Sequence, residues 1–125
     1  MGGPYHSRAV TRIAVIADDL IWSTRLATAV ERAGAEPVRM APTAPPPADA
    51  YDGAIVDMAL RAGDGTAVIE RWHAAGVPVL VIANHDDAAL RKRALAAGAD
   101  KALAYRKLFD DGPAVIAAWL GAARR

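Results

Sequence analysis

The chain has 125 residues, of which 54% are hydrophobic and 23% are charged, and it contains no cysteine. This length and composition predict one globular domain that needs no metal or disulfide to fold, and they exclude a disulfide scaffold, a thiol enzyme and a zinc ribbon. The formal net charge of +1, with scattered Lys and Arg, argues against nucleic acid as a partner. Every apolar run is too short to span a bilayer, so no membrane partner is expected.

The two ends of the chain carry little apolar patterning. Residues 1–10 are expected to form a disordered tail, and residues 11–123 are expected to form the single domain. The start of the chain is polar and contains no apolar signal-peptide core, which predicts a cytoplasmic location.

Short apolar segments alternate with segments of helical periodicity along the domain. Strands are predicted at residues 12–17, 36–40, 53–57, 78–83 and 101–104. Helices are predicted at residues 20–33, 66–75 and 86–98, and a last helix is predicted to begin at Asp111-Gly112-Pro113. Because the strands are continuously apolar, they are typical of a parallel sheet with helices on both faces, and the prediction is a three-layer α/β sandwich.

Residues 41–50 interrupt this alternation. The segment contains four prolines, each of which fixes a backbone angle and lacks an N–H donor, so no regular helix can run through it. An extended, polyproline-like connection is therefore expected between the second and third strands.

Three carboxylates follow predicted strands at the end where a parallel sheet binds ligands. Asp18 and Asp19 come after the first strand, and Asp57 ends the third. Mg²⁺ prefers such oxygen ligands, and an aspartate beside the cation can accept a phosphoryl group. In the simpler structural interpretation, Asp18 and Asp19 cap the helix that follows them.

The loop after the third strand carries a family pattern. Its sequence, DMALRAGDG at residues 57–65, is similar to the phosphoacceptor loop of two-component response-regulator receiver domains, which typically reads D-L-x-L-P-x-x-D-G. The acidic pair and the Ala-Gly-Ala-Asp run at 97–100 also match, and the resemblance extends over residues 12–120. It implies a flavodoxin-like (CheY-like) sheet of five parallel strands in the order 2-1-3-4-5, with the second helix shortened or lost at residues 41–50.

The resemblance also implies roles for the three acids. Asp57 takes the phosphoacceptor position, and Asp18 and Asp19 take the places of the metal-side acids, so the candidate Mg²⁺ site consists of Asp18, Asp19 and Asp57. The register of the pair is open by one residue, because Asp18 alternatively matches the second acid and leaves Ala17 at the first. No other cofactor follows from the sequence.

Several positions depart from the receiver pattern. Receivers place Thr or Ser at the end of the fourth strand, where this chain has Ala83. They place Lys and then Pro at the end of the fifth strand, where this chain has Tyr105 and Arg106. The aromatic switch residue three positions before that lysine is replaced by Ala102. Because phosphoryl transfer depends on positioning and electrostatics, these losses are expected to lower its rate by orders of magnitude.

Neighbouring side chains have both a functional and a structural interpretation. Lys107 replaces the missing lysine only if the fifth strand continues to it. His85, after the fourth strand, either contributes a proton or a metal ligand or is simply exposed. Tyr105, Arg106 and Lys107 form either a partner-binding patch or a solvated loop.

Three functions remain open on these grounds. The first is an atypical receiver-like domain with little or no aspartyl phosphorylation, which binds a protein partner or a second copy in signal transduction. Its expected interface is the face made by the 86–98 helix, the 101–104 strand and the last helix. The alternatives are a receiver phosphorylated at Asp57 with Mg²⁺, and a small-ligand or metal sensor that uses the acidic pocket with His85. No enzyme is expected, because the sequence lacks a G-x-S-x-G motif, a P-loop and cysteine.

Overall fold

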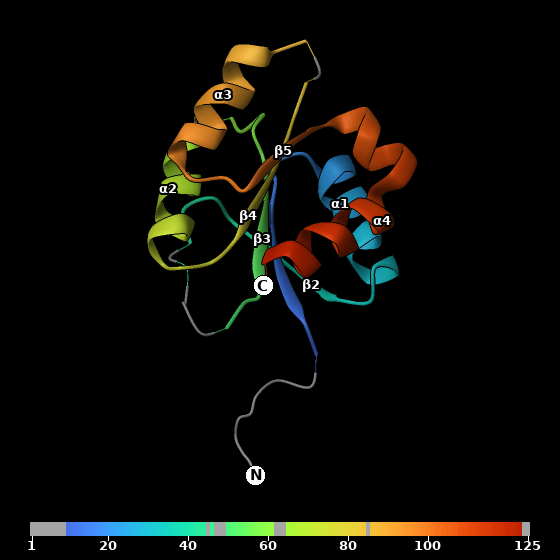
Figure 1. The fold of residues 1–125 in the computed structure, drawn as a ribbon. Coiled ribbons are helices and arrows are strands. Elements are labelled where there is room, and N and C mark those ends of the chain that lie inside the picture. The colour runs from blue at the N-terminus through green and yellow to red at the C-terminus, as the bar shows by residue number, and fades with distance from the viewer. Residues whose placement is uncertain (1–9, 45, 47–49, 62–64, 85, 124–125) are drawn as a thin grey trace.

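A computed structural model describes residues 10–44, 46, 50–61, 65–84 and 86–123 of the chain. Strands and helices alternate as expected, except between the second and third strands (Figure 1). The strands are β1 (Arg12–Ile16), β2 (Glu36–Met40), β3 (Gly53–Asp57), β4 (Val79–Ala83) and β5 (Lys101–Ala104). The helices are α1 (Leu20–Arg32), α2 (Thr66–Ala74), α3 (Ala88–Ala97) and α4 (Tyr105–Ala123).

The five strands form one parallel sheet in the order β2-β1-β3-β4-β5, which confirms the predicted topology. The three central strands are almost wholly buried, because helices cover both of their faces. The two edge strands are more exposed. Pro37 lies in the edge strand β2, where its missing N–H donor costs the ladder least.

Helices cover the sheet in two pairs. Helices α1 and α4 lie on one face, and α2 and α3 lie on the other (Figure 1). Successive strand residues point to opposite faces, so Ile13 and Ile55 pack under α1 and α4, whereas Ala54 and Val56 pack under α2 and α3. The domain is therefore the three-layer sandwich that the sequence predicts.

The connection between β2 and β3 contains no helix in its described part, residues 41–44, 46 and 50–52. This agrees with the expectation that the helix which receivers have between their second and third strands is shortened or lost here. Proline removes the hydrogen bonds that such a helix needs. The other residues of this connection, and the predicted tail at residues 1–9, lie outside the described part of the chain.

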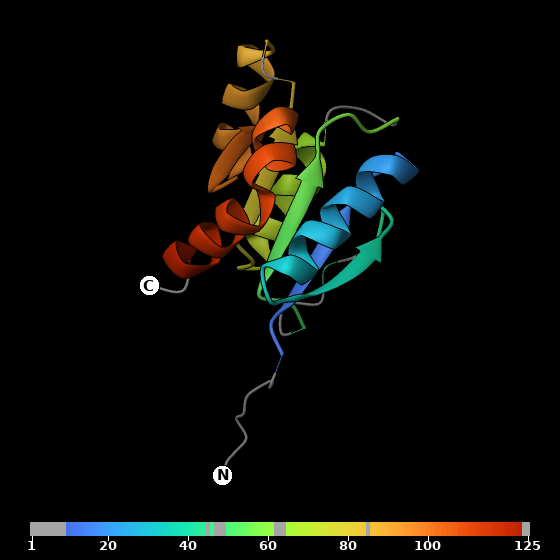
Figure 2. The ribbon, with the colours of Figure 1, turned by 90° about the vertical axis from the view of Figure 1, so that its right-hand side faces the viewer.

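The last helix, α4, joins two helices across a kink. It starts at Tyr105, directly after β5, and Asp111 interrupts it with a non-helical backbone (φ −130°, ψ 23°). The predicted helix start at Asp111-Gly112-Pro113 is confirmed for the second of these helices, and the first, which begins at Tyr105, was not predicted. Gly112 at this kink lets α4 approach α1, since a Cβ atom there would lie 3.2 Å from that of Ala29. The two parts of α4 are visible in Figure 2, where α1 and α4 face the viewer.

No helix in the described ranges combines the length and the apolar character needed to cross a bilayer.

Candidate functional site

Asp57 lies in the middle of the sheet, at the carboxyl end of β3. Asp57 is only 1% exposed to solvent. The backbone N–H of the next residue, Met58, donates a hydrogen bond to the carbonyl of Ile82 in β4 at 2.9 Å. The neighbouring strands β1 and β4 end at the same edge, so residues following them surround the carboxylate. This is the position at which an open parallel sheet places its ligand site.

The carboxylate of Asp57 is held by two donors. The phenol of Tyr105 donates a hydrogen bond to Oδ1, and the backbone N–H of Ala59 donates to the same oxygen at 3.0 Å. Tyr105 is brought there because it directly follows β5, which lies beside β4 in the sheet. Its ring also packs on that of Trp22 in α1, with centroids 4.5 Å apart and an interplanar angle of 47°.

The environment changes the ionisation of both partners in this hydrogen bond. Burial raises the pKa of Asp57, and the hydrogen bonds from Tyr105 and Ala59 offset part of the rise, while Asp19 and Asp18 add to it by charge repulsion. Burial, together with the hydrogen bond to Asp57, raises the pKa of Tyr105. The phenol is therefore neutral at physiological pH and acts as a hydrogen-bond donor, without the positive charge of an ammonium.

Both members of the acidic pair make local hydrogen bonds in the loops around the site. Asp19 caps α1 by accepting a hydrogen bond from the N–H of Trp22 at 3.0 Å. Asp18 Oδ2 accepts a hydrogen bond from the N–H of Arg61 at 2.7 Å, which ties the loop after β1 to the loop after β3. The capping interpretation of the pair is therefore confirmed for Asp19.

The three acids are not arranged as a cluster of three ligands for one metal ion. Among the residues that the structure describes, no three His, Asp or Glu side chains are placed to share a metal ion. Asp57 Oδ1 already accepts two hydrogen bonds, and Asp18 and Asp19 each accept one. These bonds use one oxygen of each carboxylate, so a cation at this edge of the sheet would bind the other oxygens together with water.

Comparison with known proteins identifies the fold. No protein-family model matches the sequence, and no curated protein matches it. Among solved structures, the chain is similar to a CheY-like receiver domain protein from Methanospirillum hungatei, with 21% identity, a TM-score of 0.71, and coverage of 93% of this chain and 98% of the other. A putative response regulator from Chloroflexus aurantiacus shares 19% identity at a TM-score of 0.72, over 90% and 98% of the two chains.

A third similar structure is the beryllofluoride-activated NtrC4 receiver domain dimer, with 19% identity, a TM-score of 0.71, and coverage of 90% of this chain and 98% of the other. The chain has the receiver-domain fold. The predicted fold is thereby confirmed, and the site around Asp57 can be compared position by position with the receiver pattern.

This chain departs most from the receiver pattern at the ends of β4 and β5. Ala83 is the last residue of β4 and is buried, and its methyl group offers no hydrogen bond. Ala102 lies within β5 opposite Val81, with no aromatic ring to rearrange. The aromatic ring nearest to Asp57 is instead that of Tyr105, which takes the place of the lysine expected in the receiver pattern.

The cationic residues after Tyr105 pair with carboxylates on their own helix. Arg106 Nε lies 3.8 Å from Asp110, and Lys107 Nζ lies 3.1 Å from Asp111. Because β5 ends at Ala104, Lys107 is a helical residue and does not occupy the strand position that its replacement of the lysine requires. His85 lies outside the described residues.

Sequence reasoning identified Tyr105 as a departure from the receiver pattern but missed its hydroxyl as the partner of Asp57. The available signal was its position, since a side chain that follows the fifth strand of such a sheet lies at the same edge as the end of the third. The sequence carries no signal that Trp22 packs on Tyr105 beside the site. Its place beside the site depends on where α1 crosses the sheet.

Proposed function

We propose that this chain is an atypical receiver-like domain that acts as a protein-interaction module in signal transduction, without enzymatic activity and with little or no aspartyl phosphorylation. The observation that supports this proposal most directly is the hydrogen bond from Tyr105 to Asp57. The neutral phenol of Tyr105 binds the carboxylate of Asp57 at the position where the receiver pattern has the ammonium group of a lysine.

The chemistry of phosphoryl transfer explains why this replacement matters. Transfer depends on positive charge and donors aimed at the developing phosphoryl oxygens, since the protein supplies little covalent chemistry. Here the hydroxyl expected at the end of β4 is replaced by the methyl group of Ala83, and the cations Arg106 and Lys107 pair with other carboxylates. Both departures from the receiver pattern thus support weak stabilisation of a phosphoryl group at Asp57 by the residues that the structure describes.

The proposal can be tested with Mg²⁺ and beryllofluoride, a phosphoryl analogue, added to the isotopically labelled chain. The amide spectrum of the wild type is expected to stay nearly unchanged. The variant Tyr105→Lys/Ala83→Thr, which restores the receiver pattern, is expected to show saturable shifts around residue 57. The same variant with Asp57→Asn is the control, and it should not respond.

A saturable response of the wild-type protein around Asp57 and Ala83 would overturn the proposal in favour of the alternative, a phosphorylatable receiver. That alternative is supported by the fold and by the position of Asp57 at the end of β3. The third hypothesis, a ligand or metal sensor, has no supporting observation within the described part of the chain.

The interface of such a module is a further part of the proposal. The face made by α3, β5 and α4 contains an edge strand and the exposed side chain of Leu95. The NtrC4 receiver domain is described as a dimer, which supports self-association as one mode for a domain of this fold. Partner affinity should change less than about threefold on Asp57→Ala, under 1 kcal/mol, if binding is independent of phosphorylation.

A further inference from the structure

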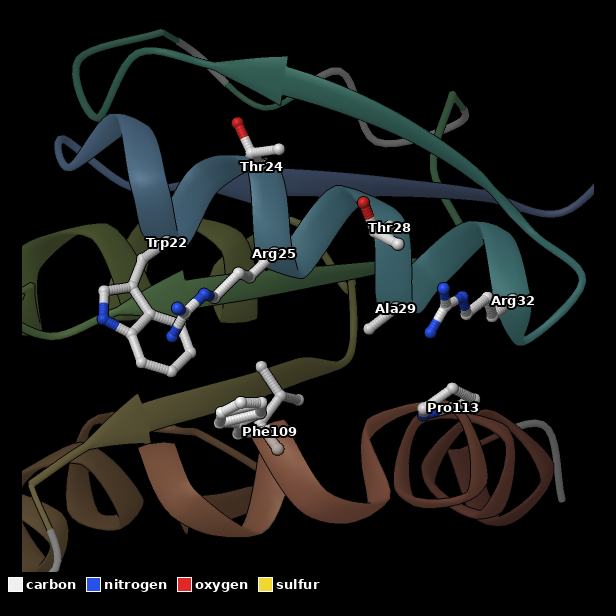
Figure 3. Close-up of a pocket in the computed structure, with 9 residues that line it drawn as sticks. Trp22, Thr24, Arg25, Thr28, Ala29, Arg32, Phe109 and Pro113 are labelled. Atoms are coloured by element: carbon white, nitrogen blue, oxygen red, sulfur yellow. The ribbon is translucent and has the colours of Figure 1, made fainter.

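A groove between α1 and α4 joins aromatic and cationic side chains at the surface. It encloses a volume of about 250 Å³ and is lined by Trp22, Arg25, Thr28 and Arg32 of α1 and by Phe109 and Pro113 of α4, with three further residues. Figure 3 shows α1 on one side and α4 on the other, with Trp22 and Arg25 of α1 extending toward Phe109 of α4. This groove lies on the opposite side of the sheet from α2 and α3.

The apolar part of the groove is unusually open to water. Phe109 is 65% exposed to solvent, whereas the preceding residue, Leu108, is buried. Leu20 and Ile21, at the start of α1 but outside the lining of the groove, are also mostly exposed. Large exposed apolar side chains cost solvation free energy, and they are retained at surfaces that bind a partner.

Arg25 holds the two aromatic walls of the groove together. Its guanidinium lies 5.2 Å from the ring centroid of Trp22 and 5.0 Å from that of Phe109 (Figure 3). Cation–π contacts of this kind fix both the guanidinium and the rings, so the aromatic surface is ordered before a partner arrives.

The groove carries positive charge that its own surroundings do not neutralise. Neither Arg25 nor Arg32 has an ion pair with a carboxylate in the ranges that the structure describes. Asp110, the acidic residue beside Phe109, faces Arg106 instead. An occupant that brings carboxylates would therefore complete the electrostatics of the groove.

The same charges argue against a second copy of this chain as the occupant. A two-fold symmetric interface brings the same patch of each copy together, so the arginines of one groove would face those of the other. Such like-charge contacts disfavour association. A different protein with acidic side chains fits the groove better.

We infer that the groove between α1 and α4 docks an amphipathic segment of a protein partner, with one apolar side chain against Phe109 and Trp22 and with carboxylates on Arg25 and Arg32. This inference rests on the proposed function as an interaction module and names the chemistry of the partner. It also moves the principal contact from the face of α3, β5 and α4 to the other side of α4.

The test uses two synthetic amphipathic peptides of about 15 residues, long enough to form a helix when bound. Both carry the same Leu and Phe residues, and their charged positions are all Glu in one and all Lys in the other. Each is titrated into the labelled full chain, and amide and indole resonances are followed. The Glu peptide should cause saturable shifts centred on Trp22, Arg25 and Phe109, and the Lys peptide should bind at least about tenfold more weakly.

Charge reversal in the groove provides the matched comparison. Arg25→Glu/Arg32→Glu should reverse the preference between the two peptides. Arg39→Glu/Lys92→Glu makes the same change in net charge at exposed positions on β2 and α3, outside the groove, and should retain it. If the first variant fails to fold, Phe109→Ser replaces it, and binding of the Glu peptide should then fall at least about tenfold.

Equal binding of both peptides, binding of neither, or shifts centred on α3 and β5 would overturn the inference. A dimer in sedimentation that is lost in Arg25→Glu/Arg32→Glu would also overturn it, in favour of a second copy. These outcomes are separate from the beryllofluoride response, which tests phosphorylation at Asp57. Failure of the groove would therefore leave that part of the proposed function standing.

Discussion

The aromatic residues of the two helical layers differ in their exposure to solvent. On the face covered by α2 and α3, Trp72 is 1% exposed and sits in a closed core. On the face covered by α1 and α4, Trp119 is buried as well, but Trp22 is partly exposed and Phe109 is 65% exposed. One layer thus encloses its tryptophan in the core, whereas the other also presents an ordered aromatic surface.

Helix α4 contributes side chains to both environments. The part of the helix after Asp111 packs Ile116, Trp119 and Leu120 on the sheet. The part before it buries Leu108 and leaves Phe109 outside. The buried positions recur at helical spacing along both parts, so they form one stripe toward α1 and the sheet, and Phe109 lies outside this stripe.

The largest expected effect on stability distinguishes the buried Trp72 from the exposed Phe109. Trp72→Ala should lower the free energy of unfolding by about 3–5 kcal/mol, because it leaves a cavity in the core under α2 and α3. Phe109→Ala should change it by less than about 0.5 kcal/mol, since little buried contact is lost. Denaturant titration measures both, and equal losses would contradict the contrast between the layers.

A second test examines how closely α4 packs on the sheet. A Cβ atom at Gly53 in β3 would lie 2.5 Å and 3.0 Å from ring atoms of Trp119, so Gly53→Ala should cost about 1–3 kcal/mol by overpacking. Gly121, on the same helix as Trp119, has no atom within 4 Å of the corresponding position. Gly121→Ala should therefore stabilise the protein by up to about 1 kcal/mol through helix propensity. A loss at both positions would show that the packing at Gly53 is not the cause.

The hydroxyl of Tyr105 provides a smaller and more local test on the side of α1 and α4. Tyr105→Phe removes the hydrogen bond to Asp57 and should lower the free energy of unfolding by about 1–2 kcal/mol. Tyr51 packs its ring on Trp72, at a centroid distance of 5.6 Å, and its hydroxyl has no hydrogen bond to the described residues. Tyr51→Phe should therefore be nearly neutral. If both substitutions have the same effect, the bond at Asp57 contributes nothing specific.

The smallest expected effect has the opposite sign and depends on pH. Because burial raises the pKa of Asp57 above its ordinary value of 3.8, the folded state binds the proton more tightly than the unfolded chain. Ionised Asp57 therefore opposes folding at neutral pH, and Asp57→Asn should stabilise the protein there by about 0.5–1 kcal/mol. This gain should shrink as the pH falls through the folded-state pKa and vanish below the ordinary value.

Thermal unfolding at several pH values measures this gain. Asp86→Asn, at an exposed position beside α3, is the control for the general loss of a negative charge. A pH-independent gain from Asp57→Asn, or the same profile in both variants, would contradict the assignment to the buried carboxylate.

The sequence by itself determined the architecture of this protein, because the relevant signals are local. Continuous apolar runs of about five residues are typical of strands buried between two helical layers, and such runs predicted the three central strands. The prolines of residues 41–50 excluded a helix there through their own backbone geometry. Asp19 was predicted as a helix cap, and it accepts a hydrogen bond from the N–H of Trp22 in α1.

The tertiary structure alone decided what surrounds Asp57 and what remains exposed. Tyr105 is 48 residues away from Asp57 in the sequence, so their hydrogen bond exists only because β5, β4 and β3 lie side by side and end at one edge. The Asp-Gly-Pro signal predicted a helix start at residues 111–113, but only the packing of α4 on the sheet brings Leu108, in the part of α4 before it, into the core. The same packing left Phe109 outside and placed Arg25 between its ring and that of Trp22. Contacts of this kind join residues that are far apart in the sequence. A pattern of neighbouring residues therefore does not predict them.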